Sequence, residues 1–175
     1  VAEMNRKAAE LGMKDTQFLD CTGLNDDGYS SAYDVAIMSR ELVMKHPKVL
    51  QFTGTWQDTF RNGTFRLDNT NKLIRFYANT DGLKTGFTSK AGFNLTATTK
   101  RNNLRLIAVV LGEPDSNTRF AEARKLLDYG FANYERVALD KKGELVGNIV
   151  VKKGTKLQVT AAYGSDTSVL VAKGE

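Results

Sequence analysis

The chain has 175 residues, 41% of them apolar, which suits one globular domain plus a smaller extra piece. It contains neither a run of 18 apolar residues nor a charged-then-apolar start, so no membrane-spanning helix or signal peptide is expected within it. The net charge of +5 is modest, spread along the chain and unaccompanied by a nucleic-acid-binding motif, which favours a solvated surface over a nucleic-acid partner. One cysteine, Cys21, and one histidine, His46, exclude a zinc site and an internal disulfide. No metal or organic cofactor is expected.

Two helices are predicted in the first third of the chain. Apolar residues at helical spacing run from Ala2 to Leu11 and stop at Gly12, a residue suited to a helix C-terminus. Val1 enters this pattern without a cap, which suggests an internal fragment. Ser31 then caps a second helix, with Asp34 three residues later in a capping-box arrangement. The expected buried stripe of this second helix consists of Tyr33, Ile37, Met38, Leu42 and Val43.

The middle of the chain is predicted to be mostly strands. Residues 55–60 and 64–67 flank Asn62-Gly63, a dipeptide that favours a type I′ hairpin turn. Further strands are expected at residues 83–88, 91–100 and 105–111. The continuous apolar run in the last of these predicts burial on both faces of the sheet.

The closing part of the chain predicts a covering helix and then a change of character. Residues 117–134 have apolar side chains on one side of a helix, which should cover the sheet. After Tyr134 the chain turns to short β-like runs separated by glycines. The sequence therefore predicts an α+β layer architecture, with a first domain at residues 1–135 and the start of a small β-rich domain at residues 136–175. About forty residues bury little core independently.

The chemically most informative stretch runs from Asp81 to Asn94 and contains Lys84-Thr85-Gly86. A leucine precedes Lys84, so the stretch is not a phosphate-binding G-x-x-x-x-G-K-[ST] loop. A structural alternative is a solvated strand in which Gly82, Gly86 and Gly92 only mark turns or bulges. A strand that approaches a ligand closely would need the same glycines.

The pattern D-G-x-K-T-G-x-T-x-x-A-G-x-N in this stretch resembles the third active-site motif of the serine D-alanyl-D-alanine carboxypeptidases, which are low-molecular-mass penicillin-binding proteins. The resemblance extends over nearly the whole chain. Met4–Met13 is similar to the family's M-N-x-K-A-x-x-L-G-M helix, and residues 121–131 are similar to its closing helix. Residues 29–34 match Y-S-[ST]-A-x-D, whereas Asp20-Cys21 replaces the usual Asn-Pro in a loop.

This resemblance implies a β-lactamase/transpeptidase-like fold, of which residues 1–135 would be the C-terminal portion. The family also needs an S-x-x-K and a Ser-x-Asn motif, but none of the seven serines has Lys three positions on or Asn two positions on. The nucleophile is therefore expected in a missing N-terminal half of the same protein. The chain alone should be inactive and should form no covalent penicillin adduct.

The physical chemistry of the motif suggests roles for five consecutive residues. Lys84 supplies a charge-assisted contact to a substrate carboxylate and a positive field beside the reaction centre, and Thr85 supplies a hydroxyl donor to the same carboxylate. Gly86 removes a side chain, so that a peptide can lie against the edge that ends at Thr88. The resemblance further implies that the backbone N–H of Phe87 completes the oxyanion hole.

The implied activity is removal of the terminal D-alanine from peptidoglycan stem peptides through an acyl-enzyme, with acylation by β-lactam antibiotics as a consequence. The implied place of action is extracytoplasmic, either secreted or at the outer face of the bacterial cytoplasmic membrane. Contact with the membrane would come only through a C-terminal anchor that this chain does not contain. Two alternatives remain open: a β-lactamase of the same fold and a non-catalytic peptidoglycan-binding module.

Overall fold

The computed structural model describes residues 1–174, which form two compact units. One contains residues 1–101 and 105–131, and the other contains residues 102–104 and the chain from Ala132 onward. The assignment of residues 136–175 to a separate β-rich domain stays a prediction, and residue 175 lies outside the described part. None of the helices within residues 1–174 has the length and apolar character needed to cross a bilayer.

The first unit begins with three helices, α1 (Ala2–Glu10), α2 (Ala32–Lys45) and α3 (Val49–Thr53). The predicted N-cap of α2 is confirmed, because the Ser31 side chain accepts the Asp34 backbone N–H at 3.1 Å. Helix α3 was not predicted. Pro47 predicts the end of α2, because proline breaks a helix. Proline is also tolerated in the first turn of a helix, so Pro47 neither excludes nor predicts the short helix that follows it.

The predicted buried stripe of α2 is largely wrong. Val43 is buried, but Tyr33 is 75% exposed. The buried side of α2 contains two polar residues instead, Asp34 and Ser39. The Asp34 carboxylate accepts hydrogen bonds from the backbone N–H of Asp15 and the hydroxyl of Thr16, both at 2.8 Å. The apolar pattern misses such positions because buried polar groups are tolerated wherever neighbours satisfy them.

A hairpin follows, formed by β1 (Gln57–Phe60) and β2 (Phe65–Asp68). The hairpin was predicted, but its turn has four residues instead of the two of a type I′ turn, since Phe60 pairs with Phe65. Arg61, Asn62 and Gly63 all have positive φ in this turn.

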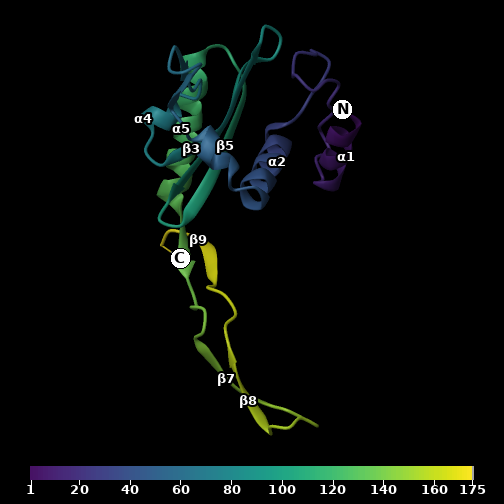
Figure 1. Cartoon of the computed structure of the whole chain (residues 1–175), viewed down its shortest axis with the longest axis vertical. Coiled ribbons are helices and arrows are strands. Elements are labelled where there is room, and N and C mark those ends of the chain that lie inside the picture. Colours follow the sequence, from purple (N-terminus) through teal and green to yellow (C-terminus); the bar gives the residue numbers. More distant parts are fainter. Residues whose placement is uncertain (175) are drawn as a thin grey trace. The chain divides into compact units, whose positions relative to one another are not determined.

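The three predicted strands form one sheet in the order β3-β4-β5, which places β3 at an edge (Figure 1). They follow the short helix α4 (Leu73–Phe76), and the long helix α5 comes after them. Their bounds are Thr80–Thr88 for β3, Gly92–Arg101 for β4, Leu104–Glu113 for β5 and Ser116–Asn133 for α5.

The core of the first unit lies between the sheet and α5 (Figure 1). It is formed by Leu73, Tyr77, Leu95, Ala97, Ala108, Val110, Phe120, Ala123 and Leu127. The α+β architecture predicted for this part of the chain is confirmed. Burial of β5 on both faces is wrong, because Ala108 and Val110 are buried while Ile107 and Val109 are only partly covered. Alternate residues of a strand face opposite sides, and α5 covers one of them.

The second unit consists of short antiparallel strand pairs. Strands β6 and β9 form one pair, and β7 and β8 form the other. Their bounds are Tyr134–Ala138 for β6, Leu145–Val150 for β7, Gln158–Ala162 for β8 and Ser168–Ala172 for β9. Most residues of these strands are exposed, in line with the small core expected of about forty residues.

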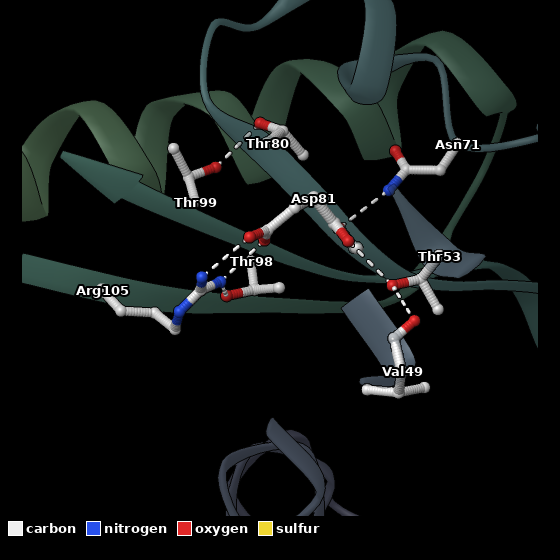
Figure 2. A network of polar contacts seen from close by, with 9 residues as sticks. Val49, Thr53, Asn71, Thr80, Asp81, Thr98, Thr99 and Arg105 are labelled. Carbon is white, nitrogen blue, oxygen red and sulfur yellow. Dashed lines mark hydrogen bonds and ion pairs between the residues drawn. The ribbon is translucent and has the colours of Figure 1, made fainter. Parts of the chain in front are cut away.

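The start of β3 is held by a polar network from both sides (Figure 2). Arg105 donates two hydrogen bonds to the Asp81 carboxylate, at 2.6 and 2.7 Å, and a third to the Thr98 hydroxyl at 2.9 Å. The hydroxyl of Thr53 donates to the Asp81 carbonyl at 2.7 Å. This network ties β3 both to β5 and to α3.

The backbone next to Asp81 is equally constrained. The Asn71 amide donates to the Gly82 carbonyl at 3.0 Å, and Asn71 is only 1% exposed (Figure 2). A Cβ at position 82 would lie 2.9 Å from the Thr53 hydroxyl oxygen and 3.2 Å from a Thr98 methyl group. Glycine is therefore required here by packing alone.

Replacing Asp81 with asparagine is expected to lower the free energy of unfolding by about 1–3 kcal/mol, because the Arg105 guanidinium loses its charged, partly buried partner. Chemical denaturation monitored by circular dichroism measures this change. Asp68→Asn is the matched control, since its pair with Arg66 is mostly exposed and should contribute less than about 1 kcal/mol. Similar losses for both variants would contradict the role given to the Asp81–Arg105 pair.

Candidate active site on strand β3

The predicted site residues lie together on the second half of β3, at the edge of the sheet. Lys84 is exposed while Thr85 is only 9% exposed, the alternation expected of neighbouring strand residues. The Lys84 ammonium turns back and donates to the Thr85 carbonyl oxygen. A cation and a hydroxyl therefore lie within one residue of each other on an edge strand.

The Thr85 side chain has a partner that the motif does not indicate. Its hydroxyl oxygen lies 2.7 Å from that of Thr70, fifteen residues earlier in the chain. Either oxygen can be the donor. Sequence reasoning missed Thr70, because it belongs to the irregular segment before α4 and shares no periodicity with β3.

The three glycines of the motif differ in what the fold requires of them. Gly92 has a positive φ, and a Cβ there would lie 2.9 Å from the Glu113 carbonyl oxygen. Gly86 has no such constraint, since its Cβ would meet only the Asn94 side chain at an ordinary 3.8 Å. Packing within the chain therefore accounts for glycine at positions 82 and 92 without any ligand. At Gly86 the same packing leaves room for a side chain, so it does not account for glycine there.

Phe87 and Thr88 end the strand. The Phe87 ring packs on that of Phe93 across the strand pair, with centroids 4.3 Å apart, and remains 55% exposed. The Thr88 hydroxyl accepts the Ala91 backbone N–H at 3.0 Å and donates to the Asp26 carboxylate at 3.4 Å. Lys90 donates to the Asp26 carbonyl at 2.8 Å. The end of β3 is therefore joined to the loop at residues 20–29.

This loop is organised by Asp20, which with Cys21 stands in place of the Asn-Pro named above. Its carboxylate accepts the backbone N–H groups of residues 22 to 25, at distances from 2.7 to 3.2 Å. These hydrogen bonds, the one from Gly23 foremost, hold the pKa of Asp20 below its ordinary value. The loop and the end of β3 line a cavity of about 540 Å³ that includes Phe18, Cys21 and Tyr29.

Arg119 is a second residue near the site that the motif does not indicate. It is 7% exposed and donates to the carbonyls of Gly86 and Asn94, both at 3.3 Å. Its guanidinium lies over the rings of Phe93 and Phe120. Burial lowers its pKa, and no carboxylate within residues 1–174 forms an ion pair with it.

The position of Arg119 could have been noticed in the sequence. It lies four residues before Ala123, so it falls on the side of α5 that faces the sheet. An arginine on a buried helix face needs acceptors or a charge partner. Here the carbonyls of β3 and β4 serve as the acceptors, and a positive charge is held directly beside Gly86.

Residues 1–174 contain no group of three or more His, Cys, Asp or Glu side chains placed to hold a metal ion. What β3 presents is a cation, a hydroxyl and a strand edge.

Comparison with protein families gives a match over most of the chain. A family model described as D-alanyl-D-alanine carboxypeptidase matches residues 1–115. The chain belongs to the D-alanyl-D-alanine carboxypeptidase family. The family assignment predicted from the Lys-Thr-Gly motif and its flanking helices is confirmed.

Individual relatives of this carboxypeptidase family extend the likeness to the whole chain. The D-alanyl-D-alanine carboxypeptidase DacF of Bacillus subtilis is 45% identical over 100% of the chain and 46% of its own length. The structure of penicillin-binding protein 5 from Haemophilus influenzae is 35% identical, with a TM-score of 0.77, over 99% of this chain and 51% of its own. The chain thus spans about half the length of the carboxypeptidases that it matches.

A similar protein has been solved with an antibiotic bound. Penicillin-binding protein D2 from Listeria monocytogenes, in a cefotaxime-bound form, is 36% identical with a TM-score of 0.69. The alignment covers 74% of this chain and 54% of that structure. The chain therefore has the fold of the penicillin-binding proteins, as predicted.

The backbone order of the loop at residues 20–29 should depend on the charge of Asp20. Because the pKa of Asp20 is lowered in the folded state, its contribution to loop order is complete above an ordinary aspartate pKa of about 3.9 and is lost as the pH falls through the lower folded value. Asp20→Ala should therefore abolish amide protection at residues 22–25 at neutral pH, whereas the unmodified loop should lose it only below about pH 3.9.

Hydrogen exchange, corrected for the intrinsic rate at each pH, measures this protection. Asp27→Ala in the same loop is the control, because its exposed carboxylate accepts no backbone N–H of residues 22–25. Unchanged protection in Asp20→Ala would show that the carboxylate does not organise the loop.

Proposed function

We propose that this chain supplies the Lys-Thr-Gly strand to the active site of a serine D-alanyl-D-alanine carboxypeptidase. The observation that carries the proposal is the family's motif on an edge strand, with Lys84 and Thr85 beside a glycine that internal packing does not require. The complete protein would remove the terminal D-alanine of peptidoglycan stem peptides through an acyl-enzyme. The nucleophilic serine would come from a part of the protein that this chain does not include.

The proposed roles follow from what each group can do chemically. The substrate ends in a carboxylate, which accepts hydrogen bonds but donates none. Thr85 would donate a hydrogen bond to this carboxylate. Lys84 would add a charge-assisted contact to it and a positive field beside the nucleophile. The buried charge of Arg119 beside Gly86 would add to that field.

The edge of β3 offers a second kind of contact. A peptide can add to an unpaired strand edge by main-chain hydrogen bonds, and Gly86 would let its backbone approach closely. The residues from Lys84 to Thr88 would form this edge, and the backbone N–H of Phe87 would contribute to the oxyanion hole. That role depends on backbone position, which is compatible with a side chain that packs sideways on Phe93.

Partners and location follow from the same chemistry. A β-lactam carries a reactive acyl group near a carboxylate, so we infer that the complete protein is acylated by these antibiotics, as its cefotaxime-bound relative suggests. Action on peptidoglycan would place the complete protein outside the cytoplasm, either secreted or at the outer face of the cytoplasmic membrane. The likeness to a carboxypeptidase over the full chain, second unit included, favours this activity over that of a β-lactamase.

The decisive variant is Lys84→Ala in the complete protein, assayed by D-alanine release from a peptide that ends in D-Ala-D-Ala. Loss of one charge-assisted interaction is expected to lower kcat/KM by roughly 10- to 150-fold. Lys84→Arg should restore activity only in part, since a planar guanidinium does not replace a compact ammonium.

A second substrate, the same peptide with a C-terminal amide, tests contact with the carboxylate. The unmodified protein should strongly prefer the acid, and Lys84→Ala should lose most of that preference.

Lys100→Ala is the matched control, because Lys100 is also an exposed strand lysine but lies on β4. It should leave both substrates unaffected, and all variants should keep their melting temperature. Equal losses of Lys84→Ala on acid and amide would mean that Lys84 acts on the chemistry alone. An unmodified protein that releases no D-alanine would refute the proposed function itself.

A further inference from the structure

The segment Asn69-Thr70-Asn71 lies between the hairpin and α4 and is fixed on both sides of its central threonine. On the N-terminal side, the Asn69 amide donates to the carbonyls of Thr53 and Thr55, at 3.0 and 2.9 Å. The Asn69 side-chain oxygen in turn accepts the Asn71 backbone N–H at 2.9 Å. Asn69 is therefore tied to the residues at and just after the end of α3 and to the backbone of Asn71.

On the C-terminal side, Asn71 is tied to β3. Its amide donates to the Gly82 carbonyl at 3.0 Å, and its side-chain oxygen accepts the Leu73 backbone N–H at 3.1 Å (Figure 2). Asn71 is 1% exposed, so these bonds are shielded from water. Thr70 stands between two anchored residues, and its backbone has little freedom to move relative to β3.

The Thr70 hydroxyl oxygen lies 2.7 Å from the Thr85 hydroxyl oxygen, a distance typical of an O–H···O hydrogen bond. Each hydroxyl has one proton to donate and two lone pairs that accept. Two arrangements are therefore available to the pair. In one, Thr85 gives its proton to Thr70; in the other, Thr70 gives its proton to Thr85.

The proposed function decides between these arrangements. If Thr85 donates its single proton to a substrate carboxylate, that proton is not available to Thr70, so the proton between the two threonines must be that of Thr70. We propose that Thr70 is a positioning residue: by donating to Thr85 it directs the Thr85 proton toward the C-terminal carboxylate of the substrate. This inference rests on the proposed function and adds to it a determinant of acid specificity.

A purely structural reading of the pair makes a different forecast. If the bond only ties the 69–71 segment to β3, its loss should reduce stability without changing the preference for a free carboxylate. Stability alone therefore does not distinguish the two readings. The ratio of kcat/KM on a free-acid peptide to that on its C-terminal amide does, because of the two readings only orientation of the Thr85 proton predicts that loss of the Thr70 hydroxyl changes this ratio.

The test uses the complete protein and Thr70→Val, which keeps the branched shape and removes the hydroxyl. Kinetics on the D-Ala-D-Ala acid and amide peptides are expected to show a loss of about 3- to 10-fold on the acid, the equivalent of one net hydrogen bond, mostly in KM and with little change on the amide. Thr70→Ser restores the hydroxyl and should restore the preference. Thr64→Val is the control, since that hydroxyl donates to the Arg61 carbonyl in the hairpin turn.

A double-mutant cycle completes the test. If Thr70 acts through Thr85, the variant with both threonines changed to valine should lose no more acid preference than Thr85→Val alone. Two results would overturn the inference about Thr70: losses of acid preference that add in the double variant, or a Thr70→Val variant with the same acid preference as Thr64→Val. In either case, a loss of acid preference in Thr85→Val would still support the proposed function. An unmodified protein without any acid preference would overturn both together.

Discussion

The Asp81–Arg105 ion pair is the constraint on which the rest of the site depends. It joins the first residues of β3 to β5 through two hydrogen bonds, in surroundings that shield it partly from water. Asn71 and Thr53, which belong to segments outside the sheet, then fix two consecutive carbonyls of β3 (Figure 2). Because a strand rises only about 3.3 Å per residue, these anchors determine where the Lys-Thr-Gly residues lie.

Beyond these anchors, each part of the Lys-Thr-Gly strand is held by a different region of the chain. Thr70 contacts the Thr85 hydroxyl, Arg119 of α5 contacts the Gly86 carbonyl, and the loop organised by Asp20 contacts Thr88. None of these contacts closes the strand edge with another strand among residues 1–174. The arrangement combines a rigid strand with an edge open to a peptide, which is what pre-organised recognition of an extended substrate needs.

The predictable parts of this fold are the elements whose residues follow a periodic or local sequence pattern. Helical spacing predicted α1, α2 and α5, and the three strands and the site motif were found from local patterns. Three kinds of feature were missed. Polar groups with buried partners, such as Asp34 and Arg119, interrupt an apolar period without being exposed. Turn geometry at Arg61 depends on the register of both strands. The Thr70–Thr85 pair joins segments that no local pattern relates.

The most direct test of the account is a crystal structure of the complete protein with a bound peptide that ends in a D-alanine carboxylate. We expect a carboxylate oxygen within hydrogen-bond distance, about 3 Å, of the Thr85 hydroxyl oxygen. The peptide should lie along the edge of β3, and the Thr70–Thr85 contact should be retained. A carboxylate bound away from β3, with Thr85 in contact with Thr70 alone, would contradict this account.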